Sequence, residues 1–510
     1  MTCRKRRSGS RRSSIPLAAA VLVALAMVGT VAAATAAGPG RPALDGVIAA
    51  QMHKHGLPGV AVAVIEGGEL VYQQGYGTAG RGRAMTPQTP MLIGSVSKSF
   101  TALAIAQLVE AGRLELDAPV RTYVPWFQVA DERASTQITV RHLLQHTSGL
   151  SDSGYPVILP KDASLEDAVR SLERARPTAA VGTRHQYFNL GYTVLGYLVE
   201  IASGESYADY LRTNILRPLG MNDTTALPQD ARGLAQGHTR LFGFNVPMAE
   251  TFPPFEIPAG IIVSTAEDLA RYALAVTGGG AGLVSPEMMR QILTPGPASY
   301  GFGWSIYDQG ALITHGGANW TFGADVNVYP RSDRAFVLLV NQGHQFDHFV
   351  SRKQLRDDVE DVVLGRATEP ITEGWSVRWM GWGVGLLALV LVVFHGRALL
   401  GLRRWRERAR AMPKGRLAWD IALSFLIPTV ITVVVLIQVR AFYGHRFNLW
   451  PTLVTMRLAV PDVFLLMLIG IVPDYVQGFF KLFSLRRTRA GLAGAPPSAR
   501  PKAPPPIRTA

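Results

Sequence analysis

The chain has 510 residues, enough for about three domain-sized units. Its formal net charge of +14 is divided unevenly. Residues 1–40 carry six Lys/Arg and no acid, residues 376–510 carry 19 Lys/Arg against four acids, and residues 41–375 are net acidic. An acidic middle offers no phosphate-binding surface, so nucleic acid is excluded as a partner. Cys3 is the only cysteine, which excludes a disulfide framework and a thiolate metal site.

The N-terminus has the order of a secretory signal. Residues 4–12 are basic, residues 15–31 are apolar and Ala-rich, and small residues follow at 32–37. This order predicts a signal peptide over residues 1–37, with an uncleaved N-terminal anchor as the alternative.

Residues 41–365 read as one globular domain of mixed α and β structure. A helical pattern at 44–53 is followed by β-rich stretches at 59–65 and 70–74, which predict a hairpin. The region 99–275 is mainly helical by periodicity. Late strand patterns lie at 301–307, 311–314, 324–329 and 335–341, and a helical stretch covers 348–364. We therefore predict that both ends of the domain share one antiparallel sheet, that helices including 348–364 cover it, and that a helical subdomain lies between.

The composition changes abruptly after a linker at 366–379. Three apolar segments follow, near 380–396, 417–437 and 458–480, and each is about long enough to cross a bilayer. Asp462, Asp474 and Gln477 interrupt the third, so we expect them to mark its ends or to face the other helices.

The charges between these segments predict a topology. The loop at 397–416 holds eight Lys/Arg and the segment 481–510 holds seven, whereas the loop at 438–457 holds three. The positive-inside rule then places the first two in the cytoplasm and the domain at 41–365 outside. We expect a multi-pass protein of the cell membrane, with a disordered basic cytoplasmic tail at 481–510.

The first candidate site element is Ser95-Val96-Ser97-Lys98, at the predicted start of a helix. Serine is a poor nucleophile unless a neighbouring base or charge activates it. Lys98 lies three residues further on, on the same helix face, and can supply this activation. Ser-x-x-Lys alone is common, so its meaning depends on two distant elements. These are Tyr187-Phe188-Asn189 before a helical pattern, and His315-Gly316-Gly317-Ala318 after a short strand.

With these three elements in order, the region 41–365 resembles the serine β-lactamase and penicillin-binding-protein family, in its class C-like branch. The resemblance implies that Ser95 forms an acyl-enzyme and that Lys98 lowers the cost of the alkoxide and passes protons. Tyr187 is the candidate general base, although the choice between Tyr187 and Lys98 stays open. Asn189 would position Lys98 and the substrate amide.

The third element would complete the site. The backbone N–H groups of Ser95 and Ala318 would form the oxyanion hole. Gly316 and Gly317 would leave the strand edge open for a substrate to lie along. His315 stands where β-lactamases have a lysine, and Gly316 where they have a threonine. A histidine could read a substrate carboxylate only where it gains charge, near about pH 6.5.

The missing lysine and hydroxyl favour a D-peptidase, esterase or amidase over an efficient β-lactamase. The expected substrate is a cell-wall peptide or a small acyl compound. The alternatives are a penicillin-binding membrane sensor that acylates slowly, a weak β-lactamase, and a catalytically silent scaffold. We expect no cofactor and no metal, because the spacings His142/His146 and His344/His348 lack the glutamate of a zinc-protease motif. The sequence does not identify any protein partner.

Overall fold

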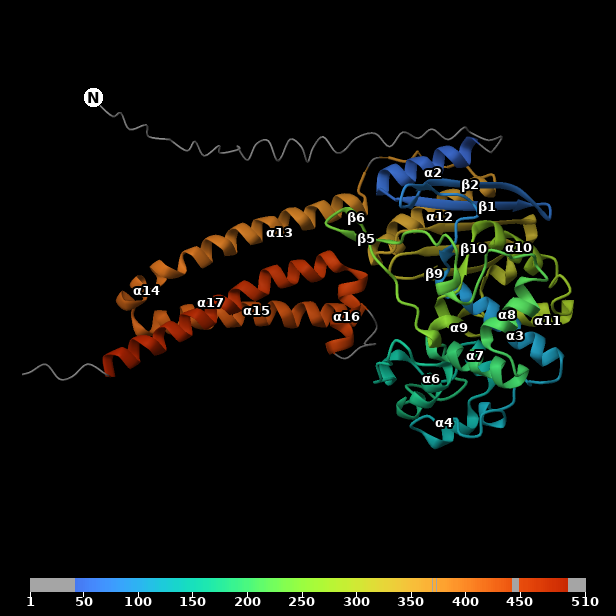
Figure 1. The fold of residues 1–510 in the computed structure, drawn as a ribbon, viewed down its shortest axis with the longest axis horizontal. Helices are drawn as coiled ribbons and strands as arrows, with labels where there is room; N and C mark the ends of the chain where they lie inside the picture. Colours follow the sequence, from blue (N-terminus) through green and yellow to red (C-terminus); the bar gives the residue numbers. More distant parts are fainter. Residues whose placement is uncertain (1–41, 369, 373, 443–448, 494–510) are drawn as a thin grey trace, which may run out of the picture. The chain divides into compact units, whose positions relative to one another are not determined.

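A computed structural model describes residues 42–368, 370–372, 374–442 and 449–493. The predicted signal peptide and the end of the predicted tail lie outside these residues. The first and last strands of the domain meet in one sheet, in which β1 (Gly59–Glu66) pairs antiparallel with β11 (Arg334–Val340) (Figure 1). The prediction that both ends of the domain share a sheet is therefore confirmed.

This sheet has seven antiparallel strands in the order β3-β2-β1-β11-β10-β9-β8. The early hairpin is β1 with β2, and the late strands supply the rest. Their bounds are β2 Glu69–Gly80, β3 Arg83–Ala84, β8 Ser305–Tyr307, β9 Leu312–Ala318 and β10 Gly323–Tyr329. All seven residues of β10 are buried, as expected for a strand covered on both faces.

Two helices from the ends of the domain pack together on the sheet. They are α2 (Pro42–His55) and α12 (Arg352–Val363), which falls within the predicted helix 348–364. Leu355 and Val359 of α12 join Val60 in a buried cluster with no solvent exposure. The amphipathic spacing of these residues explains why the helix forms against this face.

The middle of the chain is mainly helical, as predicted. Phe100 of α3 (Ser97–Glu110) stacks on Tyr272 of α10 (Ala266–Thr277) with ring centroids 4.1 Å apart. Both belong to the main buried cluster. The other helices are α4 Glu132–Gln137, α5 Val140–Leu144, α6 Leu165–Ser171, α7 Asn189–Ser203, α8 Tyr207–Leu211, α9 Ile257–Gly260 and α11 Pro286–Ile292. Two small ribbons pair β4 (Met91–Leu92) with β7 (Val263–Ser264) and β5 (His238–Leu241) with β6 (Phe244–Pro247).

A buried ion pair ties this scaffold together. Arg240 and Asp347 are 1% and 2% exposed, and two guanidinium nitrogens lie 2.8 and 2.9 Å from the carboxylate. Arg240 also donates to the carbonyl oxygen of His55 at 2.9 Å. Burial alone would raise the pKa of Asp347, but the charge and hydrogen bonds of Arg240 outweigh it and hold that pKa below its ordinary value.

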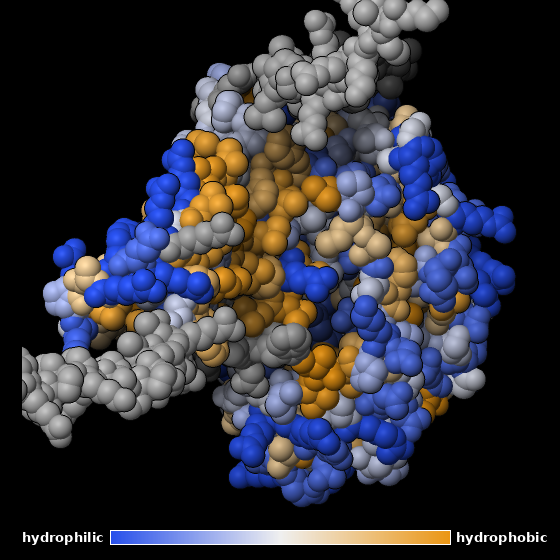
Figure 2. Space-filling model, turned by 60° about the vertical axis from the view of Figure 1, so that its left-hand side comes forward, coloured by the Kyte–Doolittle hydropathy of each residue, from blue (hydrophilic) through white to orange (hydrophobic). Residues whose placement is uncertain are grey.

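Three C-terminal helices are long and apolar enough to cross a membrane. These stretches are Val377–Leu400, Lys414–Gln438 and Pro461–Leu485, with mean hydropathies of 2.1, 2.4 and 1.8. They belong to α13 Val377–Leu400, α15 Lys414–Phe442 and α17 Pro461–Ala493, and two shorter helices, α14 Leu402–Ala411 and α16 Leu449–Ala459, complete the region. Many apolar side chains of these helices are exposed, and Figure 2 shows such apolar surface in orange.

The acids that interrupt the third segment are placed as the sequence suggested. Asp462 lies in the first turn of α17, and its carboxylate is 3.2 Å from His344. Asp474 lies further along α17 and faces α13, where its carboxylate is 3.4 Å from the imidazole of His395.

Candidate active site

Ser95 lies in a 3-10 turn, Gly94–Val96, immediately before α3, and not within the α-helix itself. Gly94 has a φ of +53°, a conformation that favours glycine. A β-carbon at Gly94 would overlap the backbone nitrogen of Ala318. The turn that carries Ser95 therefore packs directly on the end of β9.

Lys98 lies behind Ser95 in the protein interior, with no exposure to solvent. Its Nζ donates to Ser95 Oγ at 3.1 Å, to Asn189 Oδ1 at 2.8 Å and to the Ala259 carbonyl at 2.6 Å. Burial lowers the pKa of Lys98 to about 7, although the carboxylates of Asp152 and Glu256 oppose this change. A lysine that loses its proton near neutral pH can accept one from the serine hydroxyl.

Tyr187 lies in the loop before α7, close to Lys98. The Lys98 ammonium is 4.8 Å from the centroid of the Tyr187 ring. That ring packs on His146, with centroids 4.3 Å apart, and meets Tyr300 edge-on at 6.3 Å. The structure thus brings Ser95, Lys98, Tyr187 and Asn189 into one site, as the order of the motifs suggested.

The end of β9 forms the other side of the site. A β-carbon at Gly317 would overlap the carbonyl oxygen of Ile93, so glycine permits the close approach of β9 to the Ser95 turn. Strand β8 pairs with β9 only over Leu312–Thr314. Residues 315–318 therefore have no partner from β8 at the edge facing away from β10.

Arg352 of α12 fixes the peptide group that joins Gly317 to Ala318. Its guanidinium donates to the Gly317 carbonyl oxygen and lies 3.4 Å from the carboxylate of Asp325. The described residues include no cis peptide bond, so the Ala318 N–H points away from that carbonyl. The Ala318 N–H group needs this orientation in order to donate a hydrogen bond on the side where Ser95 lies.

His315 lies in β9 but does not line the cavity beside Ser95. Its imidazole is buried, with Nε2 3.1 Å from the Tyr300 hydroxyl and Nδ1 2.9 Å from the Gly316 carbonyl. Burial, and then the charge of Lys98, lowers the pKa of His315 to about 3. His315 is therefore neutral near pH 7. The prediction that it binds a substrate carboxylate by gaining charge near about pH 6.5 is wrong.

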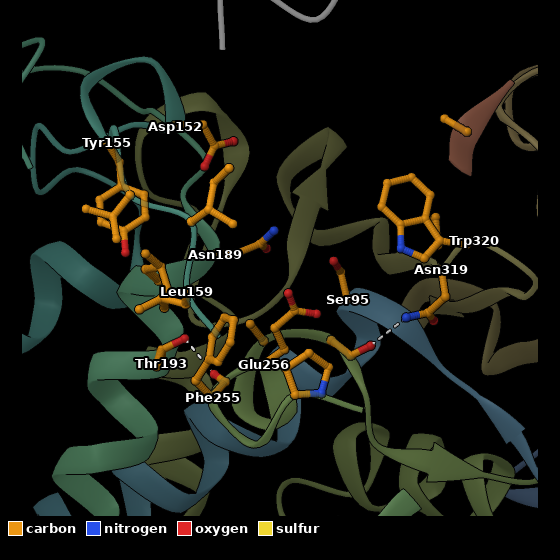
Figure 3. A pocket seen from close by; sticks show the side chains of 18 of the residues that line it. Ser95, Asp152, Tyr155, Leu159, Asn189, Thr193, Phe255, Glu256, Asn319 and Trp320 are labelled. Atoms are coloured by element: carbon orange, nitrogen blue, oxygen red, sulfur yellow. Dashed lines mark hydrogen bonds between the residues drawn. The ribbon is translucent and has the colours of Figure 1, made fainter. Parts of the chain in front are cut away.

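A cavity of about 1070 Å³ opens above Ser95. In Figure 3, Asn189 and Glu256 lie beside Ser95, Tyr155 and Leu159 lie on one side, and Trp320 lies on the other. Ala318, the expected oxyanion donor, also lines the cavity. The cavity is thus large enough for a substrate well beyond a dipeptide.

Several residues could not be assigned to the site from the sequence. Tyr300, His146 and Arg352 come from distant elements, and only the fold shows that they meet here.

The sequence contains two histidine pairs with a spacing that could hold a metal. In the pair His142/His146, His142 accepts a hydrogen bond from the Thr139 N–H at a helix start. Within the described ranges, no group of three or more His, Cys, Asp or Glu could hold a metal ion.

Comparison with known proteins places this architecture in a family. The β-lactamase family model matches residues 44–360, more than half of the chain. The chain belongs to the β-lactamase family. It is a serine hydrolase of this family, with an antiparallel sheet of the β-lactamase fold and three long apolar C-terminal helices.

Relatives in this family have varied descriptions. Penicillin-binding protein 4 of Amycolatopsis lactamdurans is 30% identical over 347 residues, which are 63% of this chain and 90% of that protein. Unguisins hydrolase of Aspergillus campestris is 30% identical over 315 residues, 56% of this chain but only 58% of that protein.

Among solved structures, an octameric penicillin-binding protein homologue from Pyrococcus abyssi matches with a TM-score of 0.56 and 29% identity, over 63% of this chain and 77% of that one. A class C β-lactamase from Rhodobacter sphaeroides, at 23% identity and a TM-score of 0.54, covers 64% of this chain and all of that one, and shares the fold.

Proposed function

We propose that this protein is a membrane-anchored, extracytoplasmic serine hydrolase that cleaves an ester, amide or D-peptide through an acyl-enzyme on Ser95. The observation that carries the proposal is the hydrogen bond from Lys98 Nζ to Ser95 Oγ, formed by a buried lysine whose pKa lies near 7. An activated serine beside a poised proton acceptor is the arrangement that acyl transfer needs.

The reaction has two halves. In the first, Ser95 Oγ attacks the substrate carbonyl and its proton passes to Lys98 or Tyr187. The bond between the carbonyl carbon and the leaving group breaks, and the leaving alcohol or amine takes up that proton. In the second, water attacks the acyl-enzyme and gives a proton to the same base, the bond between the acyl carbon and Ser95 Oγ breaks, and the base returns the proton to Oγ, which releases the acid and restores the Ser95 hydroxyl. Both tetrahedral intermediates would carry their negative oxygen between the N–H groups of Ser95 and Ala318.

Asn189 is the proposed orienting residue. Its side-chain oxygen accepts from Lys98, which leaves its amide nitrogen for the substrate. His315 would act indirectly, by holding Tyr300 beside Tyr187, and Gly316 and Gly317 would keep the strand edge open. These assignments rest on position and hydrogen bonding. They do not require a positive charge on the imidazole of His315.

The membrane part of the proposal rests on composition. Three helices have the required length and hydropathy, and the basic residues concentrate in 397–416 and after 480. This distribution supports a cytoplasmic position for those segments and an external catalytic domain.

A substrate panel tests the function. The full-length protein in detergent should hydrolyse p-nitrophenyl esters or D-Ala-D-Ala peptides faster than nitrocefin, and the Ser95→Ala variant should be inactive on all of them. The Ser153→Ala variant is the matched control, because Ser153 also lines the cavity but its hydroxyl pairs with the Ser151 hydroxyl at 2.9 Å. Fast nitrocefin turnover would favour a β-lactamase instead. Stoichiometric acylation by penicillin without turnover would favour the sensor, an alternative suggested by the description of the Amycolatopsis relative.

A further inference from the structure

One wall of the cavity above Ser95 is an apolar loop segment. Residues 155–159, Tyr-Pro-Val-Ile-Leu, connect a short turn to the start of α6 and all line the cavity. Ile158 remains 63% exposed. Trp320, on the opposite side of Ser95 in Figure 3, is 36% exposed. Large apolar side chains left at the mouth of a cavity mark a surface that a ligand covers.

Cations lie at the rim of the same cavity. Lys161, Arg174 and Arg176 line it and are exposed. The acids that line it, Asp152 and Glu256, lie close enough to Lys98 to influence its pKa. The cavity therefore has carboxylates toward the catalytic lysine, apolar walls, and a basic rim. A ligand that matches it has a carbonyl at Ser95, a long apolar group between the walls, and an anionic group at the rim.

The C-terminal helical region reaches the same cavity through the short helix α16. Ala459, the last residue of α16, is one of its lining residues. His344, also a lining residue, has its imidazole 3.2 Å from Asp462 in the first turn of α17. α17 is one of the three candidate spans. If these helices cross the membrane, the cavity opens beside the outer bilayer surface.

We propose that the substrate is an acyl amphiphile of the outer membrane leaflet. Its chain would lie between residues 155–159 and Trp320, and its anionic head group beside Lys161, Arg174 and Arg176. This inference rests on the proposed function, since it needs both Ser95 chemistry and an external, membrane-anchored domain. The substrate would then come from the bilayer and would not be a small soluble acyl compound.

Chain length provides the first test. The full-length protein is reconstituted in phosphatidylcholine vesicles and given p-nitrophenyl butyrate or p-nitrophenyl dodecanoate. We expect kcat/KM for the dodecanoate to exceed that for the butyrate by about tenfold or more, because several extra methylenes are buried. The Ile158→Ser/Trp320→Ser double variant should lose most of this preference. Val71→Ser, which changes an exposed apolar residue of β2 outside the cavity, should keep it.

Three outcomes separate the two proposals. Equal kcat/KM for the two esters in the wild type overturns the amphiphile proposal and leaves the hydrolase intact. A preference that survives in the double variant also overturns it, because the chain would then bind elsewhere. If neither ester is cleaved in a Ser95-dependent manner, the amphiphile proposal fails, and the proposed hydrolase fails with it only if D-Ala-D-Ala peptides are also left intact.

The head group provides the second test. Lysophosphatidylglycerol and monododecanoylglycerol differ in charge, and fatty-acid release from each is measured in the same vesicles. We expect the wild type to prefer the anionic lipid, the Arg174→Gln/Arg176→Gln variant to lose this preference, and Arg133→Gln, an exposed cation outside the cavity, to retain it. Inorganic phosphate should inhibit the hydrolysis of monododecanoylglycerol far less than lysophosphatidylglycerol does. Equal rates on both lipids, or equal inhibition by phosphate, would overturn recognition of a lipid head group.

Discussion

Lys98 is the residue on which the proposed chemistry depends most. A fully buried ammonium is costly, and the three acceptors around Nζ stabilise it only in part. The result is a pKa of about 7 in place of the ordinary lysine value of 10.5. Burial lowers this pKa because it disfavours the charged form. Lys98 is charged below this pH and neutral above it.

This titration predicts the pH dependence of acylation. A base must be unprotonated to accept the serine proton, so kcat/KM on a neutral ester should rise with pH and level off above a midpoint near about 7. The measurement is kcat/KM for p-nitrophenyl butyrate from about pH 5 to 9. A profile that is flat through this range would show that Lys98 does not control the step.

The Tyr187→Phe variant resolves which group is the base. If Lys98 is the base, the variant keeps the rise near pH 7 at a reduced rate. If Tyr187 is the base, the variant loses nearly all activity at every pH in the range. His315→Gln serves as a control, because a neutral His315 predicts an unchanged midpoint.

The residues of the site were predictable to different degrees. Ser95 and Lys98 are three apart on one helical stretch, so their contact follows from local geometry. Tyr187 and Asn189 were found through the resemblance, since no spacing rule connects them to Ser95. The burial of His315 depends on Tyr300, fifteen residues earlier, and no local pattern could show that the imidazole turns toward it.

At the scale of elements, the proposed oxyanion hole would be assembled from β9, the Ser95 turn and α12. Gly316 and Gly323 face Arg352 across β9 and β10, and a β-carbon at Gly323 would lie 2.8 Å from its guanidinium. Glycine at these positions leaves room for the arginine. Arg352 can then hold the Gly317 carbonyl on one side while the Ala318 N–H points to the other.

Arg352 should therefore support catalysis without binding substrate. We expect Arg352→Ala to lower kcat by roughly tenfold to a hundredfold with little change in KM, because an oxyanion donor loses its orientation. Arg352→Lys should recover part of the rate, since an ammonium can still donate to the carbonyl. Steady-state kinetics on one ester measure both effects.

Arg356 is the matched control for this prediction. It also faces Asp325, at 4.0 Å, but its guanidinium donates to Asp357 of α12 at 2.8 Å. Arg356→Ala should keep kcat near the wild-type value. If both alanine variants lose activity equally, the effect comes from the charge balance at Asp325 and not from the Gly317 peptide.

The sheet itself was largely predictable from the sequence. β-rich stretches in the early hairpin and strand patterns late in the domain located β1, β2, β9, β10 and β11, and the helical middle left the two ends to pair with each other. The contribution of α12 to the site was not predictable. Its apolar face predicts packing on the sheet, but nothing in the sequence indicates that Arg352 reaches the Gly317 carbonyl.

At the scale of the whole molecule, the chain combines a hydrolase domain with an apolar helical region. Length and hydropathy were sufficient to locate the three long helices, although α13, α15 and α17 extend beyond the predicted segments. The shorter α14 and α16 were not predicted, because α14 is too polar and α16, at 11 residues, is too short to carry a spanning signal. α14 is rich in arginine, in agreement with the charge bias that predicts its cytoplasmic position.

The proposed topology can be tested with reporter fusions. An alkaline phosphatase fusion after Thr368 should be active, because the enzyme folds only outside the cytoplasm, and a fusion after Met412 should be inactive. A green fluorescent protein fusion at each site should give the opposite pattern. Equal activity at both positions would contradict the spanning of α13, which lies between them.

Covalent labelling is the measurement that bears most directly on the proposed function. The full-length protein is treated with a fluorescent fluorophosphonate, digested, and analysed by mass spectrometry. We expect one modified residue, Ser95, with labelling lost in Ser95→Ala, slowed strongly in Lys98→Ala, and retained in Ser153→Ala. Modification of another serine, or labelling that persists in Ser95→Ala, would contradict an acyl-enzyme at Ser95.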